Sequence, residues 1–177
     1  MLQQVKDYGT NLHTSIHWLA SRVLLQQLYA GKTIGLNKDE FNKPSLLIDS
    51  NLFHVSISHS HEYAAVIVSE HNTVAVDIEK VDDRVIRVAH KFIREDELVA
   101  DESLQAMAYT IIWSGKESLY KYYSRKELDF KQNLRIDSFT ISPEPFTIKG
   151  YIQKGEYQKE LVLHVITLGD YMLTYIV

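Results

Sequence analysis

Two acidic side chains lie two positions apart in the mainly apolar segment TVAVDIEK, residues 73–80. Successive side chains of a strand point to opposite faces, so Asp77 and Glu79 would project side by side. Carboxylates this close repel each other unless a cation lies between them, and their oxygens are ligands that suit Mg²⁺. Two surface acids at a solvated strand end would give the same pattern. The segment alone therefore leaves a metal site and a solvated strand end open.

The segment WSGKESLYK, residues 113–121, lies in a helix predicted over residues 103–124. At 100° per residue the apolar residues form one face, and Trp113, Glu117 and Lys121 lie near the opposite side. Glu117 and Lys121 have the spacing of a surface ion pair, which stabilises a helix by only roughly 0.2–0.5 kcal/mol. That pair leaves Trp113 unexplained, because a large aromatic side chain on a polar face is usually covered. We expect Trp113 to pack beneath a site or across an interface between lobes.

A group of hydroxyl and imidazole side chains occupies residues 58–61, at the end of the predicted strand VSIS. Hydroxyls, an imidazole and the N–H groups of a turn can together hold a phosphate. Serine and histidine are also ordinary turn residues, so turn chemistry explains the group too. A third interpretation is a transition-metal site, since imidazoles suit zinc or copper, although the histidine spacing matches no standard motif. The histidines concerned are His54, His59, His61 and His71.

The elements that would position these groups mix helices and strands. Apolar residues three and four apart predict helices over residues 12–31, 83–98 and 103–124. Strand-like runs before the second helix are LFHVSIS, YAAVIVS and TVAVDIE; those after the third are RIDSFTI, FTIKGYIQ, ELVLHVITL and YMLTYIV. The segment GLNKDEFNKPSLL is turn-rich, with Lys43 extended before Pro44. This order predicts an α+β fold with antiparallel hairpins at the end.

The composition excludes several classes of protein. Against 23 Asp and Glu residues, 19 Lys and Arg residues leave a net charge of −4, which gives no general attraction to nucleic acid or an anionic membrane. The absence of cysteine excludes disulfides and thiolate zinc sites, and suits a reducing compartment. No window approaches 18 apolar residues, and the N-terminal residues lack the apolar core of a signal peptide. We therefore expect a cytoplasmic protein.

Four cations follow the acidic segment at spacings of three, four and three: Arg84, Arg87, Lys91 and Arg94. On a helix these spacings gather the four side chains on one face. Either a solvated helix face or a docking surface for an acidic partner has this pattern. We favour docking, because four cations on one face without an interleaved acid are uncommon.

Four segments, taken in order, resemble the signature series of the 4′-phosphopantetheinyl transferase superfamily, in its surfactin-synthetase-activating type. They are NKP at residues 42–44, SISHS at 56–60, VAVDIE at 74–79 and WSGKESLYK at 113–121. The resemblance runs from about Arg22 to Ile141. It implies the family fold, a pseudo-twofold pair of α/β lobes that each have a small antiparallel sheet packed on helices. The lobes would be residues 1–76 and 77–177, with the site between them.

The resemblance also implies an activity. Members of this family transfer the phosphopantetheine arm of coenzyme A to a serine of an apo acyl or peptidyl carrier protein and release 3′,5′-ADP. Asp77, Glu79 and Glu117 would bind Mg²⁺ together with the pyrophosphate, and Glu117 would act as the base, directly or through water. A divalent ion among these carboxylates and a pyrophosphate agrees with the charges involved. Lys121 would steady the phosphate charge, with Lys116 assisting.

Further residues take roles at coenzyme A by the same resemblance. Lys43 would contact the nucleotide, and Ser58 and His59 match contacts to the 3′-phosphate region. Arg22 would either touch the ligand or brace the interface between the lobes. The four cations of residues 84–94 would dock the carrier, which is acidic in this class of protein.

Three departures separate the chain from the family pattern. His61 and Ala75 stand where the family often has glycine, and both crowd the backbone locally. His13 and His17 stand where the family tends to carry a basic cluster and an acid. By the same resemblance the N-terminal lobe is shorter than is usual for this type, so part of the coenzyme A clamp is expected to be missing. An alternative function is therefore a paralogue that binds coenzyme A or a carrier without transfer. Two lobes fused in one chain favour a monomer, with neither nucleic acid nor a membrane as a partner.

Overall fold

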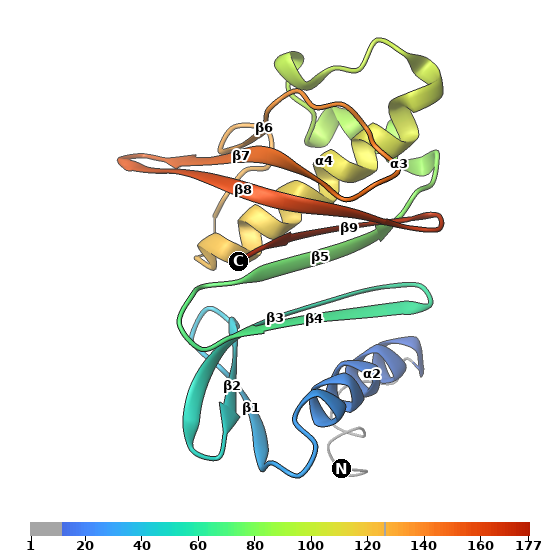
Figure 1. Cartoon of the computed structure of the whole chain (residues 1–177). Coiled ribbons are helices and arrows are strands. Elements are labelled where there is room, and N and C mark those ends of the chain that lie inside the picture. The colour runs from blue at the N-terminus through green and yellow to red at the C-terminus, as the bar shows by residue number, and fades with distance from the viewer. Residues whose placement is uncertain (1–11, 126) are drawn as a thin grey trace.

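The computed structural model describes residues 12–125 and 127–177, and within the first helix it describes side chains from Ile16 onward. The chain forms two antiparallel sheets, one above the other in Figure 1, and each is packed against one long helix. This arrangement confirms the predicted α+β class. No helix in the described ranges is both long and apolar enough to cross a membrane.

The N-terminal sheet has four strands in the order β1-β2-β3-β4 and packs against one helix. The elements are α2 (Leu12–Leu28), β1 (Ile34–Lys38), β2 (Pro44–Ile48), β3 (Asn51–Ser60) and β4 (Tyr63–Ser69). Strands β1 and β2 lie in the segment interpreted from sequence as turn-rich. Their connection is tight, because Asp39 Oδ1 accepts hydrogen bonds from the backbone N–H groups of Phe41 and Lys43. Lys43 is thereby fixed directly before β2.

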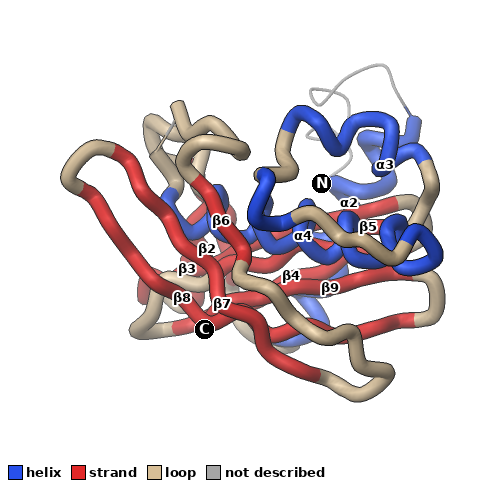
Figure 2. Tube along the Cα trace, turned by 90° about the horizontal axis from the view of Figure 1, so that it is seen from above, coloured by secondary structure: helices blue, strands red, loops and turns tan. Residues whose placement is uncertain are grey.

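The C-terminal sheet has five strands in the order β5-β9-β8-β7-β6. Its elements begin with β5 (Ala75–Lys80), α3 (Arg84–Val88), two 3₁₀ turns (Ala89–Lys91 and Glu95–Glu97) and α4 (Glu102–Tyr123). They continue with β6 (Leu134–Ile136), β7 (Phe146–Lys154), β8 (Tyr157–Leu168) and β9 (Tyr171–Ile176). Figure 2 shows α3 and the turns after it at the opposite end of the molecule from the β7–β8 turn. Helix α4 packs on this sheet and supplies much of the larger hydrophobic core.

The two sheets meet where β3 lies against β5. Serines at alternate positions of β3 take the place of a backbone ladder: Ser56 Oγ accepts a hydrogen bond from Val76 N, and Ser58 Oγ accepts one from Ile78 N. These contacts satisfy the N–H groups of a strand that is buried on both faces. Because β5 begins at Ala75, the predicted boundary between residues 76 and 77 falls inside a strand of the C-terminal sheet.

The predicted helix over residues 83–98 is wrong beyond its first turns. Helix α3 ends at Val88, and after a 3₁₀ turn the backbone at Arg94 is extended. Phe92 and Ile93, which follow the 3₁₀ turn, are both buried. The Glu97 side chain turns back to accept a hydrogen bond from the backbone N–H of Arg94. Arg94 therefore does not share a helix face with the other three cations.

Candidate active site at the junction of the two sheets

Asp77 is the most buried carboxylate at the junction, with 3% of its surface exposed. Its Oδ1 accepts hydrogen bonds from Ser58 Oγ at 2.8 Å and Lys121 Nζ at 2.8 Å. Lys121 Nζ also donates to the carbonyl oxygen of Val76 at 3.0 Å. The second oxygen, Oδ2, is buried and has no partner among the described residues. A buried carboxylate oxygen without a donor is costly, so this atom indicates a missing ligand.

Glu79 follows Asp77 on β5 and is held by two donors. Trp113 Nε1 donates to Glu79 Oε1 at 3.1 Å, and Ser60 Oγ donates to Oε2 at 3.3 Å. Burial, reinforced by the charge of Asp77, nevertheless raises the pKa of Glu79 from its usual 4.5 to about 6. The two hydrogen bonds and Lys121 oppose that rise without cancelling it.

Glu117 projects from α4 toward the same carboxylates. Burial and then the charge of Asp77 raise its pKa from 4.5 to about 7, with Glu79 adding to the effect and Lys121 opposing it. Among the described residues, no group donates a hydrogen bond to this carboxylate. Three acids therefore share one lysine at this site, and the balance of charge is negative.

The donor set fits a magnesium ion that arrives with an anionic substrate. Asp77 Oδ2 lacks a partner among the described residues, and burial together with the charge of Asp77 raises the pKa values of Glu79 and Glu117, so a cation bound there would stabilise their ionised forms. Within residues 12–125 and 127–177, no three His, Asp or Glu side chains already form a metal cage. Mg²⁺ does not require one, since it commonly takes one or two carboxylates and completes its shell with water and substrate phosphates.

Trp113 packs beneath the acids, as expected from the sequence. Its ring lies between two others, edge to face with Phe92 at a centroid distance of 5.0 Å and stacked on Phe130 at 5.2 Å. The indole N–H then points to Glu79. The residue that the helix wheel left unexplained is therefore a support for one of the carboxylates.

A cavity of about 250 Å³ opens beside Lys121, between the two sheets. Its lining includes Lys43 from the β1–β2 connection, and Tyr120, Ser124 and Arg125 at the end of α4. Lys43 Nζ donates to Ser124 Oγ at 3.3 Å, and burial lowers the pKa of this lysine. Three cations around one cavity favour an anionic ligand. The sequence pointed to Lys43 and Lys121, whereas Ser124 and Arg125 fall outside the recognised segments.

A second cavity, of about 380 Å³, lies on the other side of Glu79. Its lining includes Glu79 and Trp113, His61 from the β3–β4 turn, and Arg84 from the start of α3. The second cavity thus borders the acidic group at Glu79, whereas the basic cavity borders Lys121, the partner of Asp77.

Comparison with known proteins gives this arrangement a family. Residues 73–176, more than half of the chain, match the 4′-phosphopantetheinyl transferase superfamily. The chain belongs to this superfamily. It is also 31% identical over 108 residues to the "4′-phosphopantetheinyl transferase gsp" of Aneurinibacillus migulanus. The match covers 58% of this chain and 44% of that relative, so the chain spans less than half of the relative's length.

Within this member of the superfamily, the role predicted for Lys116 at the phosphate is wrong. The side chain of Lys116 is 0% exposed, and its Nζ donates to Glu97 Oε2 and to the carbonyl oxygens of Phe92 and Phe130. All three N–H donors of the ammonium group are occupied inside the protein. Lys116 therefore cannot reach a phosphate at the acidic site.

Three other predicted ligand residues also have partners in the protein. Ser58 is buried and its hydroxyl holds Asp77, so it braces a carboxylate and is not available to a phosphate. Arg22 lies 3.6 Å above the Trp18 ring and donates to the carbonyl oxygen of Trp18, and because both residues belong to α2, these contacts leave its predicted role at the ligand or at the interface between the lobes a prediction. His59 is exposed, and its ring stacks on His17 at 4.2 Å.

Two of the four predicted docking cations have acidic partners. Arg84 Nη2 lies 2.9 Å from Asp82 Oδ2, and Arg94 Nε lies 2.9 Å from Asp96 Oδ1. Arg87 and Lys91 are exposed. Docking by these four residues stays a prediction. The residues lie on α3, on the 3₁₀ turn after it and on the extended stretch at Arg94, and not on a single helix face.

The two departures from family glycines have different settings. His61 has a φ of 46°, in the left-handed region that glycine occupies most easily. Histidine is among the residues that tolerate this region best, and the carbonyl oxygen of His61 lies 2.9 Å from His17 Nε2. Ala75 is fully buried in the C-terminal core. By strand alternation it lies on the same face of β5 as Asp77 and Glu79.

Proposed function

We propose that this protein transfers the 4′-phosphopantetheine arm of coenzyme A to a serine of an apo acyl or peptidyl carrier protein, with release of 3′,5′-ADP. The observation that carries the proposal is the unpartnered buried Oδ2 of Asp77, set among two further acids and beside a basic cavity. A divalent cation and a pyrophosphate would satisfy both the orphan oxygen and the cations. Family membership supplies the chemistry that such a pair of ligands would undergo.

In this proposal the protein holds coenzyme A by its charged end. Lys43 and Arg125 line the cavity that would receive the nucleotide and its phosphates. Lys121 lines the same cavity while bonded to Asp77, so it would connect the phosphate to the acids. Asp77, Glu79 and Glu117 would hold Mg²⁺, which would neutralise charge on the pyrophosphate when bound.

Glu117 has the properties of a general base. Its pKa of about 7 lies near the working pH, and no hydrogen bond from a described residue restrains its oxygens. The serine oxygen of the carrier would form a bond to the phosphorus that bears pantetheine, as the bond from that phosphorus to 3′,5′-ADP breaks. The serine proton would pass to Glu117, directly or through water.

The carrier would approach from the side of α3. The cavity next to Glu79 is bordered by Arg84, and the exposed Arg87 and Lys91 lie further along the same segment. Ile86 and Val88, which are 37% and 43% exposed, add apolar contact area between these cations. A surface with this composition suits an acidic helical partner that also has apolar residues. Both substrates are cytoplasmic in this proposal, and we expect the protein to act as a monomer.

A paralogue that binds without transfer is the second candidate function. The engagement of Ser58, Arg22 and Lys116 within the protein favours it, because these side chains leave fewer contacts for the coenzyme A phosphates. The acids, Lys43 and Lys121 are untouched by this argument, so transfer remains the stronger proposal.

One experiment separates the two functions. The protein is incubated with coenzyme A, Mg²⁺ and a panel of apo acyl and peptidyl carriers, and the mass of each carrier is followed. We expect a phosphopantetheine adduct on at least one carrier, lost when Mg²⁺ is chelated and when the carrier serine is replaced by alanine. Calorimetric binding of coenzyme A with no adduct on any carrier would establish the paralogue instead.

A further inference from the structure

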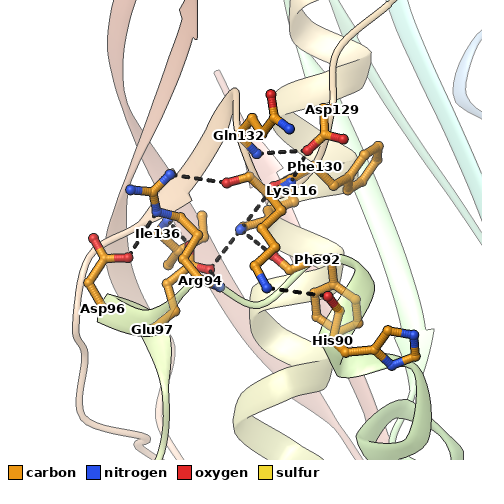
Figure 3. Close-up of polar contacts among 11 residues, drawn as sticks. His90, Phe92, Arg94, Asp96, Glu97, Lys116, Asp129, Phe130, Gln132 and Ile136 are labelled. Atoms are coloured by element: carbon orange, nitrogen blue, oxygen red, sulfur yellow. Dashed lines mark hydrogen bonds and ion pairs between the residues drawn. The ribbon is translucent and has the colours of Figure 1, made fainter.

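Lys116 and Glu97 form an ion pair that is closed to solvent. Lys116 Nζ lies 2.7 Å from Glu97 Oε2, and the two side chains are 0% and 1% exposed. Glu97 Oε2 also accepts from the backbone N–H of Arg94 at 2.9 Å, and Oε1 accepts from the N–H of Ile136 at 2.8 Å. Figure 3 shows the two side chains converging from α4 and from the turn before it. Both carboxylate oxygens have donors and all three N–H groups of the ammonium are used, so no polar atom of this pair lacks a partner.

The other two donors of Lys116 reach separate segments. Nζ donates to the carbonyl oxygen of Phe92 at 2.7 Å and to that of Phe130 at 3.0 Å. Phe92 precedes the extended stretch at Arg94, whereas Phe130 lies in the connection between α4 and β6. Figure 3 shows Phe92 and Phe130 on either side of the lysine nitrogen, each joined to it by a hydrogen bond. One ammonium group thus fixes the main chain at two places far apart in the sequence.

Phe92 and Phe130 are also the two residues whose rings pack on Trp113. Trp113 in turn donates its indole N–H to Glu79 at the acidic site. Lys116 therefore holds the main chain of both residues whose rings flank the indole. A continuous set of contacts therefore runs from the closed ion pair to a carboxylate of the open site.

We propose that Lys116 is a positioning residue for the acidic site, which orients Glu79 through the ring slot formed by Phe92 and Phe130 around Trp113. Its effect on metal binding rests on the function proposed above, whereas its effect on the Trp113 slot does not. Removal of the ammonium group should loosen the slot, so that Trp113 gains water and Glu79 loses its fixed donor. The contact to coenzyme A should be unaffected, because Lys116 lies away from the basic cavity.

The test compares two lysine-to-methionine substitutions in a Trp18→Phe background, where Trp113 is the only tryptophan. Lys116→Met keeps the apolar stem and removes the three donors. Lys43→Met is the matched control in the basic cavity. The measurements are the emission maximum of Trp113, its quenching by acrylamide, and calorimetric binding of coenzyme A and of Mg²⁺ in its presence, with circular dichroism as the check on folding.

We expect Lys116→Met to shift the Trp113 emission to longer wavelength, to increase its quenching, and to weaken Mg²⁺ binding by up to about tenfold, near the lower end of effects seen when a partner of a metal ligand is removed. Its affinity for coenzyme A alone should stay within about twofold of the parent, because the residue has no contact with the cavity. Lys43→Met should do the reverse, weakening coenzyme A binding and leaving the Trp113 emission unchanged.

Two results would overturn the proposal. One is a folded Lys116→Met protein with unchanged Trp113 emission and quenching. The other is a loss of coenzyme A affinity as large as that of Lys43→Met, which would make Lys116 a phosphate ligand. If Lys116→Met does not fold, the same measurements are made on Glu97→Asp. This substitution keeps the negative charge but shortens the side chain by one methylene, which moves the carboxylate away from Lys116. If no carrier is modified, the proposed transfer fails, yet the fluorescence still decides whether Lys116 positions the slot.

Discussion

Helix α4 carries two lysines, Lys116 and Lys121, and each pairs with a carboxylate from the segments before the helix. Lys116 pairs with Glu97 in a contact closed to solvent, and every polar atom of that pair has a partner. Lys121 pairs with Asp77, but its side chain is 27% exposed and lines the basic cavity. One oxygen of Asp77 has no donor among the described residues. Two pairs of the same chemical type thus differ in whether their hydrogen bonding is complete.

This difference separates structural from functional charge. A buried ion pair that meets all its hydrogen bonds holds segments together and has no capacity for a ligand. An ion pair with an unpartnered polar atom is stable only when the surrounding contacts hold it in place. A ligand that supplies the missing partner then gains binding energy at that atom. Both residues are lysines of the same helix, so only the partners that the fold brings to them make the distinction.

The largest expected effect concerns Glu117, at the open pair. Glu117→Gln should reduce transfer by roughly 10²–10⁴-fold, since a general base of matched pKa contributes about this much. The fold should be intact, because no described residue hydrogen-bonds to this side chain. The measurement is single-turnover modification of a carrier by mass spectrometry, with circular dichroism as the control. Transfer at the parent rate would show that Glu117 is neither the base nor a necessary metal ligand.

The second prediction compares the two lysines directly. Lys116→Met leaves Glu97 buried without its cation, so the free energy of unfolding should fall by about 3–5 kcal/mol. Lys121→Met removes a partly exposed cation from buried Asp77, which keeps its hydrogen bond from Ser58, so the free energy of unfolding should fall by less than in Lys116→Met while transfer is largely abolished. Urea denaturation followed by circular dichroism measures both. Equal losses of stability from the two substitutions would mean that the closed and open pairs do not differ as described.

The candidate site was predictable from the sequence where it depends on local pattern. Asp77 and Glu79 share a strand face, Glu117 and Lys121 share a helix face, and the structure brings all four together. Trp113 was predicted to pack beneath a site, and it does. In these cases a two-residue or four-residue spacing fixes the direction of the side chain, whatever the rest of the fold.

The sequence failed where a role depends on distant partners. Lys116 lies beside Glu117 in the recognised segment, but one residue turns it 100° around the helix, toward Glu97 and two carbonyl oxygens that no local pattern reveals. The break after α3 has the same origin, because Phe92 is drawn into the core by α4. Strand β1 was missed because its stability comes from pairing with β2, not from its own residues.

The third prediction is a dependence of stability on pH that arises at the open pair. The folded pKa values of Glu79 and Glu117, about 6 and about 7, exceed their usual 4.5, so the native protein retains protons that the unfolded chain releases. Without metal, stability should therefore fall as pH rises from about 4.5 to about 7, by several kcal/mol, since one pKa unit corresponds to about 1.4 kcal/mol. Thermal unfolding between pH 5 and pH 8 measures it.

Two controls tie that dependence to the acids. Glu117→Gln cannot ionise, so it should flatten the fall and leave the metal-free protein more stable than the parent at pH 8. Mg²⁺ with coenzyme A should raise the unfolding temperature more at pH 8 than at pH 6, because the ligands must be deprotonated. The same rise at both pH values would contradict the link between metal binding and these carboxylates.

The smallest effect distinguishes two buried serines that differ only in what they hold. Ser58 Oγ donates to Asp77 at the open pair, whereas Ser118 Oγ lies 2.8 Å from Thr174 Oγ1 inside the C-terminal lobe. Substitution of either serine by alanine removes one hydroxyl, and should lower the free energy of unfolding by about 1 kcal/mol. Only Ser58→Ala should also weaken Mg²⁺ binding in the presence of coenzyme A, because Asp77 then loses one of its two supports. A calorimetric affinity for Mg²⁺ that is equal in the two variants would show that Lys121 alone orients Asp77, and that the hydroxyl of Ser58 serves the contact between β3 and β5 alone.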